Sequence, residues 1–284
     1  RTPLVAMVIA AGINIILDLV FVAGLHMGVA GAALATVIAQ CFSALYCFII
    51  VRKIEIVHIT KEDFRAVPGL NRKLLSLGTP ILFQDVIISV GGLAVQFVVN
   101  GYGFLFVAGF TATNKLYGIL EMAAISYGYA IVTYVGQNLG AGQISRIKKG
   151  VHVSGFLAFL TSAFISVMMF IFGKHILRMF ISGDPAQTEQ VLGIAWHYLS
   201  IMASVLCILY FLYVYRSALQ GLGDTMIPML SGVVEFFIRV GVALLLPKIM
   251  GQNGIFYAEI TAWTGAAVLL AVSYYIRIRK FRES

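Results

Sequence analysis

Two long apolar stretches of this sequence carry carboxylates that could hold a cation or a proton. Asp85, Ser89 and Gln96 recur at spacings of four and seven residues, so on a helix they share one face. On the next stretch Asn114 and Glu121 are seven residues apart and also share a face. A carboxylate at the centre of a membrane costs about 2.5 to 3.5 kcal/mol on insertion scales, so each one requires a partner or a function. Burial favours the protonated form and a nearby cation favours the ionised form, so Asp85 and Glu121 are candidates for coupling ion movement.

The same side chains also have structural interpretations. Ser89, Gln96 and Asn114 could form hydrogen bonds between packed helices instead of lining a cavity. The carboxylates could be salt-bridge partners of Lys115, which lies in the same stretch as Glu121. Tyrosine rings could receive an organic cation or could pack in the core. The tyrosines considered for a substrate cavity are Tyr117, Tyr210 and Tyr213.

A second charged group lies in a later stretch, where Glu235 and Arg239 are four residues apart. This spacing lets the two side chains pair on one helical face, and Ser231 extends that face. Because paired charges are poorly placed to bind a mobile ion, we predict a structural ion pair here.

The composition places the chain among integral membrane proteins. Of its 284 residues, 60% are hydrophobic and 11% are charged, whereas soluble domains are about 25% charged. The net charge of +8 comes from basic residues between the apolar stretches, where they report membrane orientation and do not indicate nucleic-acid binding. The three cysteines show no CxxC spacing and no histidine at ligand spacing, so no metal site is expected. No cofactor is predicted other than a coupling ion.

Apolar runs bounded by turn and charge signals predict an all-α membrane protein with eight transmembrane helices, each able to cross about 30 Å of hydrocarbon. The predicted spans are 3–25, 29–51, 74–99, 108–138, 151–173, 191–217, 226–247 and 253–276. The chain starts with Arg1 and enters the first span almost at once, so it is expected to be part of a longer polypeptide.

Lysine and arginine residues are distributed unequally between the two sides of these spans. Fifteen, counting Arg216, fall on the side that holds both termini, and three fall on the other side. Because cytoplasmic loops carry the excess of basic residues, both termini are predicted to be cytoplasmic. The connection 54–73 lies on the same side, and its mixed composition suits a short interfacial helix.

The first helix pair repeats near the end of the chain at an offset of 223 residues. The turns GVAG (28–31) and GQNG (251–254) coincide at this offset, and the paired spans have equal length. Alanines also coincide: Ala35, Ala39 and Ala44 with Ala258, Ala262 and Ala267. A repeat of this kind predicts one complete six-helix half and the last two helices of another, which is transporter architecture.

Three segments resemble the multidrug and toxic compound extrusion (MATE) transporters. ATNKLYGILEMAAISYGYAIVTYVGQNLGAG (112–142) is similar to the region that closes the second helix of that family's C-terminal half. SALQGLGDTMIPMLSGVVEFFIRV (217–240) resembles the start of its penultimate helix, and residues 1–40 resemble its fifth and sixth helices. The resemblance covers nearly the whole chain in the family's order.

The resemblance implies part of a twelve-helix, two-lobed exporter whose first four helices precede this chain. Residues 1–53 would end the N-terminal lobe, 54–73 would link the lobes, and 74–284 would form the C-terminal lobe. The implied activity is export of cationic, amphipathic drugs in exchange for Na⁺ or H⁺ across a bacterial cell membrane, in contact with its lipids. The family's sodium-coupled branch is expected to carry carboxylates near Ile88 and Leu209, which are apolar here.

The segment YVGQNLGAG (134–142) ends the span that carries Glu121. Gln137 and Asn138 could bond the free backbone groups at this helix end, and Gly140 could adopt the left-handed conformation that stops a helix. Gln220, Gly221 and Gly223 show a similar pattern at a neighbouring cytoplasmic end. The segment is therefore predicted to close the cytoplasmic end of a drug cavity.

Two other functions compete with antiport. A flippase for lipid-linked saccharides would be expected to line its cavity with several arginines, and Arg239 is the only arginine predicted to lie fully within the membrane. A membrane enzyme would need a catalytic constellation, but no HExxH or serine–histidine arrangement occurs at membrane depth. The antiporter interpretation is therefore favoured.

Overall fold

The computed structural model describes residues 2–54 and 67–281, which fold into helices joined by short turns. They form two compact units, Arg1–Pro68 and Gly69–Ser284. The boundary falls within the predicted connection 54–73, but residues 55–66, and with them the predicted interfacial helix, lie outside the described residues. The first unit contains α1 (Thr2–Asp18), the π-helical turn η1 (Leu19–Gly24) and α2 (Gly28–Val51).

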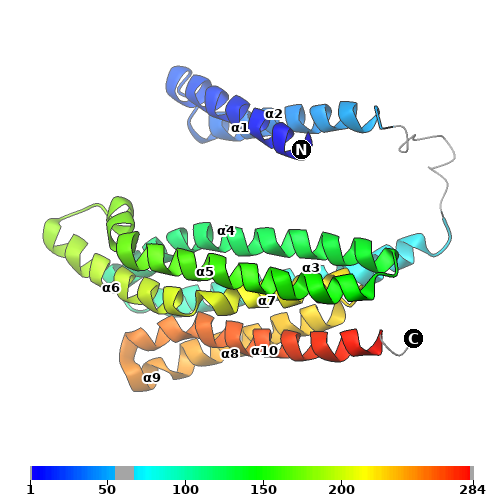
Figure 1. Ribbon diagram of the computed structural model, residues 1–284. Helices are drawn as coiled ribbons and strands as arrows, with labels where there is room; N and C mark the ends of the chain where they lie inside the picture. The colour runs from blue at the N-terminus through cyan, green and yellow to red at the C-terminus, as the bar shows by residue number, and fades with distance from the viewer. Residues whose placement is uncertain (1, 55–66, 282–284) are drawn as a thin grey trace. The chain divides into compact units, whose positions relative to one another are not determined.

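The second unit holds the remaining helices (Figure 1). These are α3 (Leu70–Asn100), α4 (Phe104–Gly140), α5 (Ile144–Phe180), α6 (Pro185–Ser204), α7 (Leu206–Gly221), α8 (Met226–Leu245), α9 (Pro247–Met250), the 3₁₀ turn η3 (Gly251–Phe256) and α10 (Tyr257–Lys280).

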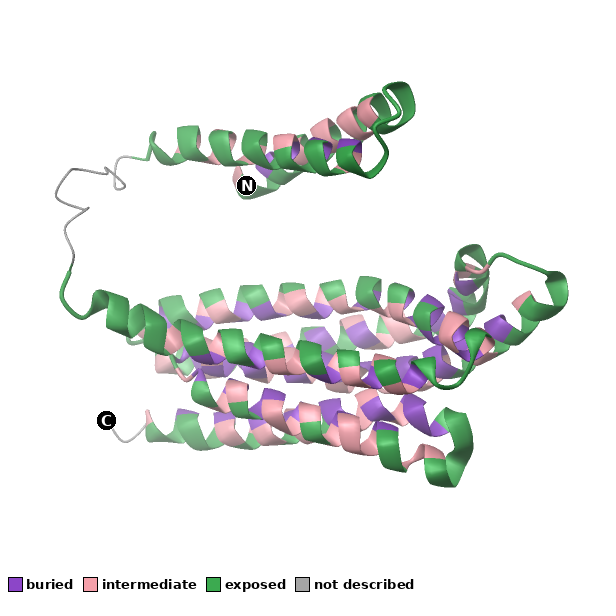
Figure 2. Cartoon of the chain, turned by 180° about the vertical axis from the view of Figure 1, so that it is seen from behind, coloured by how far each residue is buried: buried purple, intermediate pink, exposed green. Residues whose placement is uncertain are grey.

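Six helical stretches in the described residues are long and apolar enough to cross a membrane, and the bent pair α6 and α7 makes a seventh. One of the six, Met226–Lys280, contains both α8 and α10, which pack side by side and so cross separately (Figure 1). The outer faces of the second unit are largely exposed, as the green parts of the ribbon in Figure 2 show, and they carry exposed apolar side chains such as Phe97, Phe104 and Ile249. In water such faces would be unstable, so the predicted helical membrane class is confirmed.

The helices extend beyond the apolar runs from which they were predicted. The span predicted at 151–173 belongs to α5, which runs from Ile144 to Phe180 and includes basic residues at both ends. The span predicted at 108–138 starts four residues earlier, at Phe104. Hydropathy marks only the part of a helix inside the hydrocarbon, whereas the backbone stays helical in the interfacial layer until a turn residue ends it.

The two predicted repeat turns each contain a glycine with a positive φ angle. Gly28 and Gly251 have φ angles of 56° and 65°, a conformation that favours glycine. A Cβ atom at Gly31 would lie 2.9 Å from the Cβ of Met27, and one at Gly254 would lie 2.7 Å from backbone of Leu246. The alanine pairs Ala35 with Ala258 and Ala39 with Ala262 are buried. Both turns therefore need glycine at equivalent positions, which supports the 223-residue offset.

The helix that crosses through α6 and α7 bends by 51° at Val205. Val205 has φ −120° and ψ 14°, which interrupts the helical hydrogen bonds. The carbonyl oxygen of Ala203 accepts a hydrogen bond of 2.7 Å from the hydroxyl of Ser166 in α5. A hydroxyl from a neighbouring helix thus satisfies a carbonyl at the bend, as an apolar layer requires.

The end of α4 differs in detail from the prediction. The left-handed residue is Gly142, with φ 69°, and Gly140 is the last helical residue. The amide nitrogens of Gln143 and Gly142 donate to the carbonyl oxygens of Asn138 and Leu139, which is the Schellman pattern. The end of α7 repeats it: Gly223 has φ 80°, and its amide and that of Asp224 donate to Gln220 and Leu219. The helix-stop interpretation of this segment is therefore correct, with the stop two residues later.

Close contact between α4 and α7 depends on Gly221. A Cβ atom there would lie 2.7 Å from the Cβ of Val135 and 2.9 Å from the carbonyl oxygen of Val132. We expect Gly221→Ala to destabilise the protein by about 1 to 3 kcal/mol, since the helices must move apart. The measurement is the detergent-solubilised protein's unfolding in a denaturing-detergent titration.

Gly193→Ala in α6 is the matched control, because a Cβ atom there meets nothing within 4 Å. Equal stability losses in the two variants would contradict the close packing of α4 on α7.

Candidate functional site

A cavity of about 670 Å³ lies within the second unit. Five helices contribute its walls, α3, α4, α7, α8 and α10, and they can be followed in Figure 1. Its lining combines four carboxylates with two guanidinium groups: Asp85, Glu121, Glu235, Glu259, Arg216 and Arg239. With all of these groups ionised, the cavity carries an excess of negative charge that would attract a cation.

Five of the predicted coupling and cavity residues line this cavity. They are Asp85 and Ser89 on α3, Tyr117 and Glu121 on α4, and Tyr213 on α7. The hydroxyl of Tyr213 donates a hydrogen bond of 2.9 Å to Oε1 of Glu121. The hydroxyl of Ser89 donates to the carbonyl oxygen of Asp85 at 2.7 Å, within its own helix. The structure thus brings the two candidate carboxylates to one cavity from different helices.

Three predicted cavity residues lie elsewhere. Tyr210 is fully buried, and its hydroxyl donates at 3.2 Å to the carbonyl oxygen of Leu120, which corrects the expectation that it faces the cavity. Gln96 donates at 2.9 Å to Oδ1 of Asn100 and does not line the cavity. Asn114 does not line the cavity either, and it lies about one helical turn before Tyr117 in α4. The polar stripe on α3 therefore reaches the cavity only at Asp85 and Ser89.

The three residues of the motif predicted at the cytoplasmic end behave as structural groups. Asn138 is buried, and its amide nitrogen donates at 2.8 Å to the carbonyl oxygen of Tyr134 in its own helix. Gln137 is exposed and Gly140 completes the last turn of α4. None of these three residues lines the 670 Å³ cavity.

Glu235 and Arg239 belong to a larger network of buried charges. They are 3.6 Å apart, but the closer partner of Glu235 is Arg216 on α7. The closer partner of Arg239 is Glu259 on α10, with 2.8 Å between Nη2 and Oε2. Ser231 accepts a hydrogen bond of 3.3 Å from Arg216, so it lies on the predicted face. The network joins α7, α8 and α10, because each arginine contacts a carboxylate on another helix.

Arg216 and Glu259 were not among the predicted site residues. Arg216 was counted with the basic residues of the cytoplasmic side, at the end of the span predicted at 191–217, but it is buried and lies seven residues before Gly223, the left-handed residue that follows the helix. Glu259 follows the repeat turn within the last predicted span, and it is the one acidic residue of that span. A lone carboxylate inside an apolar span could have marked Glu259 as a candidate site residue. Nothing in the sequence around Arg216 indicates that its side chain turns toward α8.

Aromatic rings surround the carboxylates. Tyr117 stacks on Trp263 of α10, with 5.5 Å between the ring centroids and an angle of 20° between the planes. Both rings and Tyr213 line the cavity together with Glu121 and Glu259. Rings beside carboxylates can bind a flat or quaternary organic cation through its charge and its apolar surface.

Ile88 and Leu209, where the resemblance implied carboxylates for the sodium-coupled branch, also line the cavity. Both are apolar, so the charge of this cavity comes from other positions. Arg239 contacts the same turn of α3, donating at 3.2 Å to the carbonyl oxygen of Ile88.

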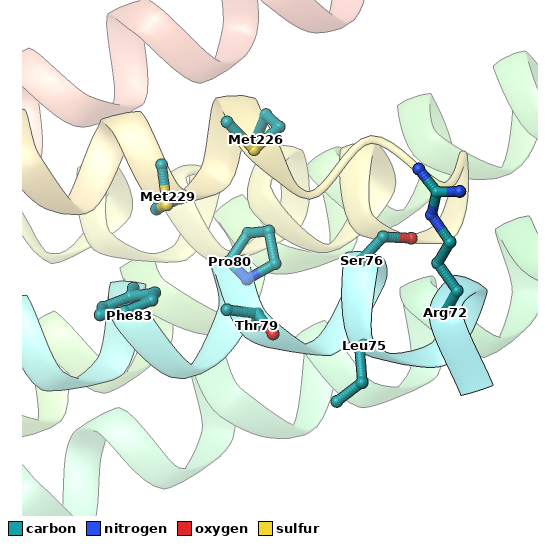
Figure 3. A pocket seen from close by; sticks show the side chains of 8 residues that line it. All are labelled: Arg72, Leu75, Ser76, Thr79, Pro80, Phe83, Met226 and Met229. Atoms are coloured by element: carbon teal, nitrogen blue, oxygen red, sulfur yellow. The ribbon is translucent and has the colours of Figure 1, made fainter.

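A second hollow, of about 640 Å³, lies between α3 and α8 near the start of α3 (Figure 3). Its lining is mainly apolar, with Pro80, Phe83, Met226 and Met229, and Arg72 is its charged residue. It contains none of the predicted site residues, so the first cavity is the candidate functional site.

Comparison with known proteins agrees with the fold. The chain is 28% identical over 264 residues to the probable multidrug resistance protein YpnP of Bacillus subtilis, covering 90% of this chain and 56% of that protein. It is 23% identical over 278 residues to the multidrug export protein MepA of Staphylococcus haemolyticus, covering 97% of this chain and 60% of MepA. The chain thus spans less than two thirds of the length of these relatives.

Solved structures show the same fold. A MATE crystal structure in complex with MaL6 superposes with a TM-score of 0.89 at 20% identity, covering 99% of this chain and 63% of that one. A MOP superfamily transporter from Pyrococcus furiosus, described as having a binding pocket of reverse polarity that suggests a different function, gives a TM-score of 0.90 at 21% identity, with 99% and 63% coverage.

The family comparison covers most of the candidate site. The MatE family profile matches residues 80–245, which include Asp85, Glu121, Arg216, Glu235 and Arg239. This match extends over more than half of the chain. The chain therefore belongs to the MatE family.

Proposed function

We propose that this chain forms part of a secondary active exporter that expels cationic, amphipathic compounds in exchange for Na⁺ or H⁺. The observation that carries the proposal is the position of Glu121 in the cavity. The hydroxyl of Tyr213 donates a hydrogen bond to it, and no ion pair among the described residues includes it. A carboxylate without a counter-charge beside three aromatic rings suits an organic cation or a coupling ion.

The proposal assigns distinct roles to the lining residues. Glu121, with Asp85, would hold the exchanged positive charge, while Tyr117, Tyr213 and Trp263 would contact the apolar part of the substrate. Ser89 would contribute a hydroxyl to the wall. The multidrug relatives YpnP and MepA support the substrate class. Membrane lipids and the remaining helices of the same transporter would surround these residues.

Orientation follows from the basic residues. The ends of α2 and α10 and the starts of α3 and α5 carry most of the lysines and arginines of the described chain. We propose that these ends are cytoplasmic in a bacterial cell membrane. The asymmetry remains when the buried Arg216 is not counted with the cytoplasmic residues.

Ethidium efflux tests this function. Cells that express the full open reading frame encoding this sequence are expected to lose ethidium faster than cells with an empty vector. An imposed proton or sodium gradient, applied separately, should accelerate the loss several-fold, because antiport draws its energy from that gradient. The measurement is the fall in ethidium fluorescence after the gradient is applied.

Arginines in the cavity wall favour one alternative, a flippase for lipid-linked saccharides. Arg216 and Arg239 both line the cavity, although both are paired with carboxylates. If neither gradient accelerates the efflux of any dye and the protein transports a lipid-linked sugar, the flippase proposal replaces the antiporter proposal.

A further inference from the structure

We infer that Arg239 is an internal competitor for the cation site: it pairs with Glu259 in the structure, and a cation entering the cavity displaces it. This inference rests on the proposed function and describes how the same cavity is regulated. It assigns Glu259 as a second carboxylate of the site, beside Glu121.

Glu259 is the most accessible member of the charge network. Its side chain is 18% exposed, whereas those of Glu235, Arg239 and Arg216 are 3%, 6% and 8% exposed. It lines the same cavity as Glu121 and Tyr117. A cation in this cavity can therefore reach Glu259 without unfolding the network.

Arg239 can leave Glu259 without becoming an unpaired buried charge. Its guanidinium also lies 3.6 Å from Glu235 and donates at 3.2 Å to the carbonyl oxygen of Ile88. When Arg239 leaves Glu259 it therefore loses one of its three contacts and keeps those to Glu235 and Ile88. This avoids the large cost of leaving a buried charge without a partner.

The charge balance favours such an exchange. Glu235 already neutralises Arg216 and part of Arg239, while Glu121 has no basic partner among the described residues. A monovalent cation held between Glu121 and Glu259 would supply the missing positive charge. The arginine would then return to Glu259 when the cation leaves, so the ion pair between α8 and α10 reports whether the cavity is loaded.

A competitor and a purely structural ion pair predict opposite effects on binding. Removing a structural arginine should loosen the cavity and weaken cation binding. Removing a competitor should strengthen it, because the incoming cation no longer has to break the contact between Arg239 and Glu259. Double-mutant cycles on close charge pairs show that the interaction energy between two such side chains is large enough to measure.

The test is binding of tetraphenylphosphonium to the purified full-length protein in detergent, by equilibrium dialysis. We expect Arg239→Gln to lower the Kd by about fivefold relative to the wild-type protein, and Arg216→Gln not to lower it. Arg216→Gln is the matched control, because it removes one buried positive charge from the same network but no contact with Glu259. In a Glu259→Gln background the advantage of Arg239→Gln should disappear.

The outcomes separate this inference from the proposed function. A Kd for Arg239→Gln that equals or exceeds the wild-type Kd overturns the competitor role. If Arg239→Gln does not fold, Arg239→Lys replaces it, since a lysine cannot make the same forked contacts and competes less well. If Arg239→Lys binds tetraphenylphosphonium with a Kd equal to or higher than that of the wild-type protein, the inference is also overturned. A wild-type protein that binds no organic cation would instead overturn the function itself.

Discussion

Glu235→Gln is expected to destabilise the six-helix unit by about 3 to 5 kcal/mol, because it removes one partner from a buried charge network. Glu235 is the carboxylate between two buried arginines, and its side chain is 3% exposed. Arg239 would keep Glu259, but Arg216 would retain only the hydroxyl of Ser231 at 3.3 Å and the ring of Tyr213. The Nε atoms of both arginines already lack a hydrogen-bond partner, so the network has no spare acceptor.

The measurement is the free energy of unfolding from a denaturing-detergent titration of the solubilised protein. Glu189→Gln is the matched control, since Glu189 pairs with Arg178 at a site where the side chains are 55% and 62% exposed. That pair should contribute less than about 1 kcal/mol. Similar small losses in both variants would show that the buried network does not stabilise the fold.

Glu121→Gln is expected to lower gradient-driven ethidium efflux by about tenfold or more while leaving expression near normal. The amide keeps the size of the side chain and can still accept a hydrogen bond from Tyr213, but it cannot take a charge or release a proton. Efflux rate per unit of protein in the membrane, with the proton and sodium gradients imposed separately, is the quantity to compare.

Two further variants sharpen that result. Asp85→Asn should also lower coupled efflux, because Asp85 lines the same cavity from α3. Gln96→Ala serves as the control, since Gln96 lies on the same helix but outside the cavity. Full activity of both Glu121→Gln and Asp85→Asn would place ion coupling elsewhere in the polypeptide.

Sequence patterns predicted the elements of this fold well because hydrophobicity and turn chemistry are local. Long apolar runs identified the spans, and the glycines at 28 and 251 identified two equivalent turns that the backbone reproduces. Helix ends were less accurate, since a helix continues past the hydrocarbon until a left-handed residue such as Gly142 or Gly223 stops it.

Predictions of individual side-chain positions were mixed. Asp85, Ser89, Tyr117, Glu121 and Tyr213 line one cavity, as expected for polar or aromatic residues on shared helical faces. Tyr210 precedes Tyr213 by one turn, yet it packs in the core against α4. A spacing pattern gives the relative angle of two residues on a helix but does not give the direction in which that helix is turned.

The sequence by itself determined the membrane class, the number and order of the spans, the repeat and the resemblance to the MATE family. Each depends on local hydropathy, turn residues or a contiguous motif. Only the tertiary structure decided that Arg216, Glu235, Arg239 and Glu259 form one network and that Glu121 faces the same cavity. The physical reason is that an apolar layer makes every helix form locally, whereas the rotation of each helix is set by packing against its neighbours.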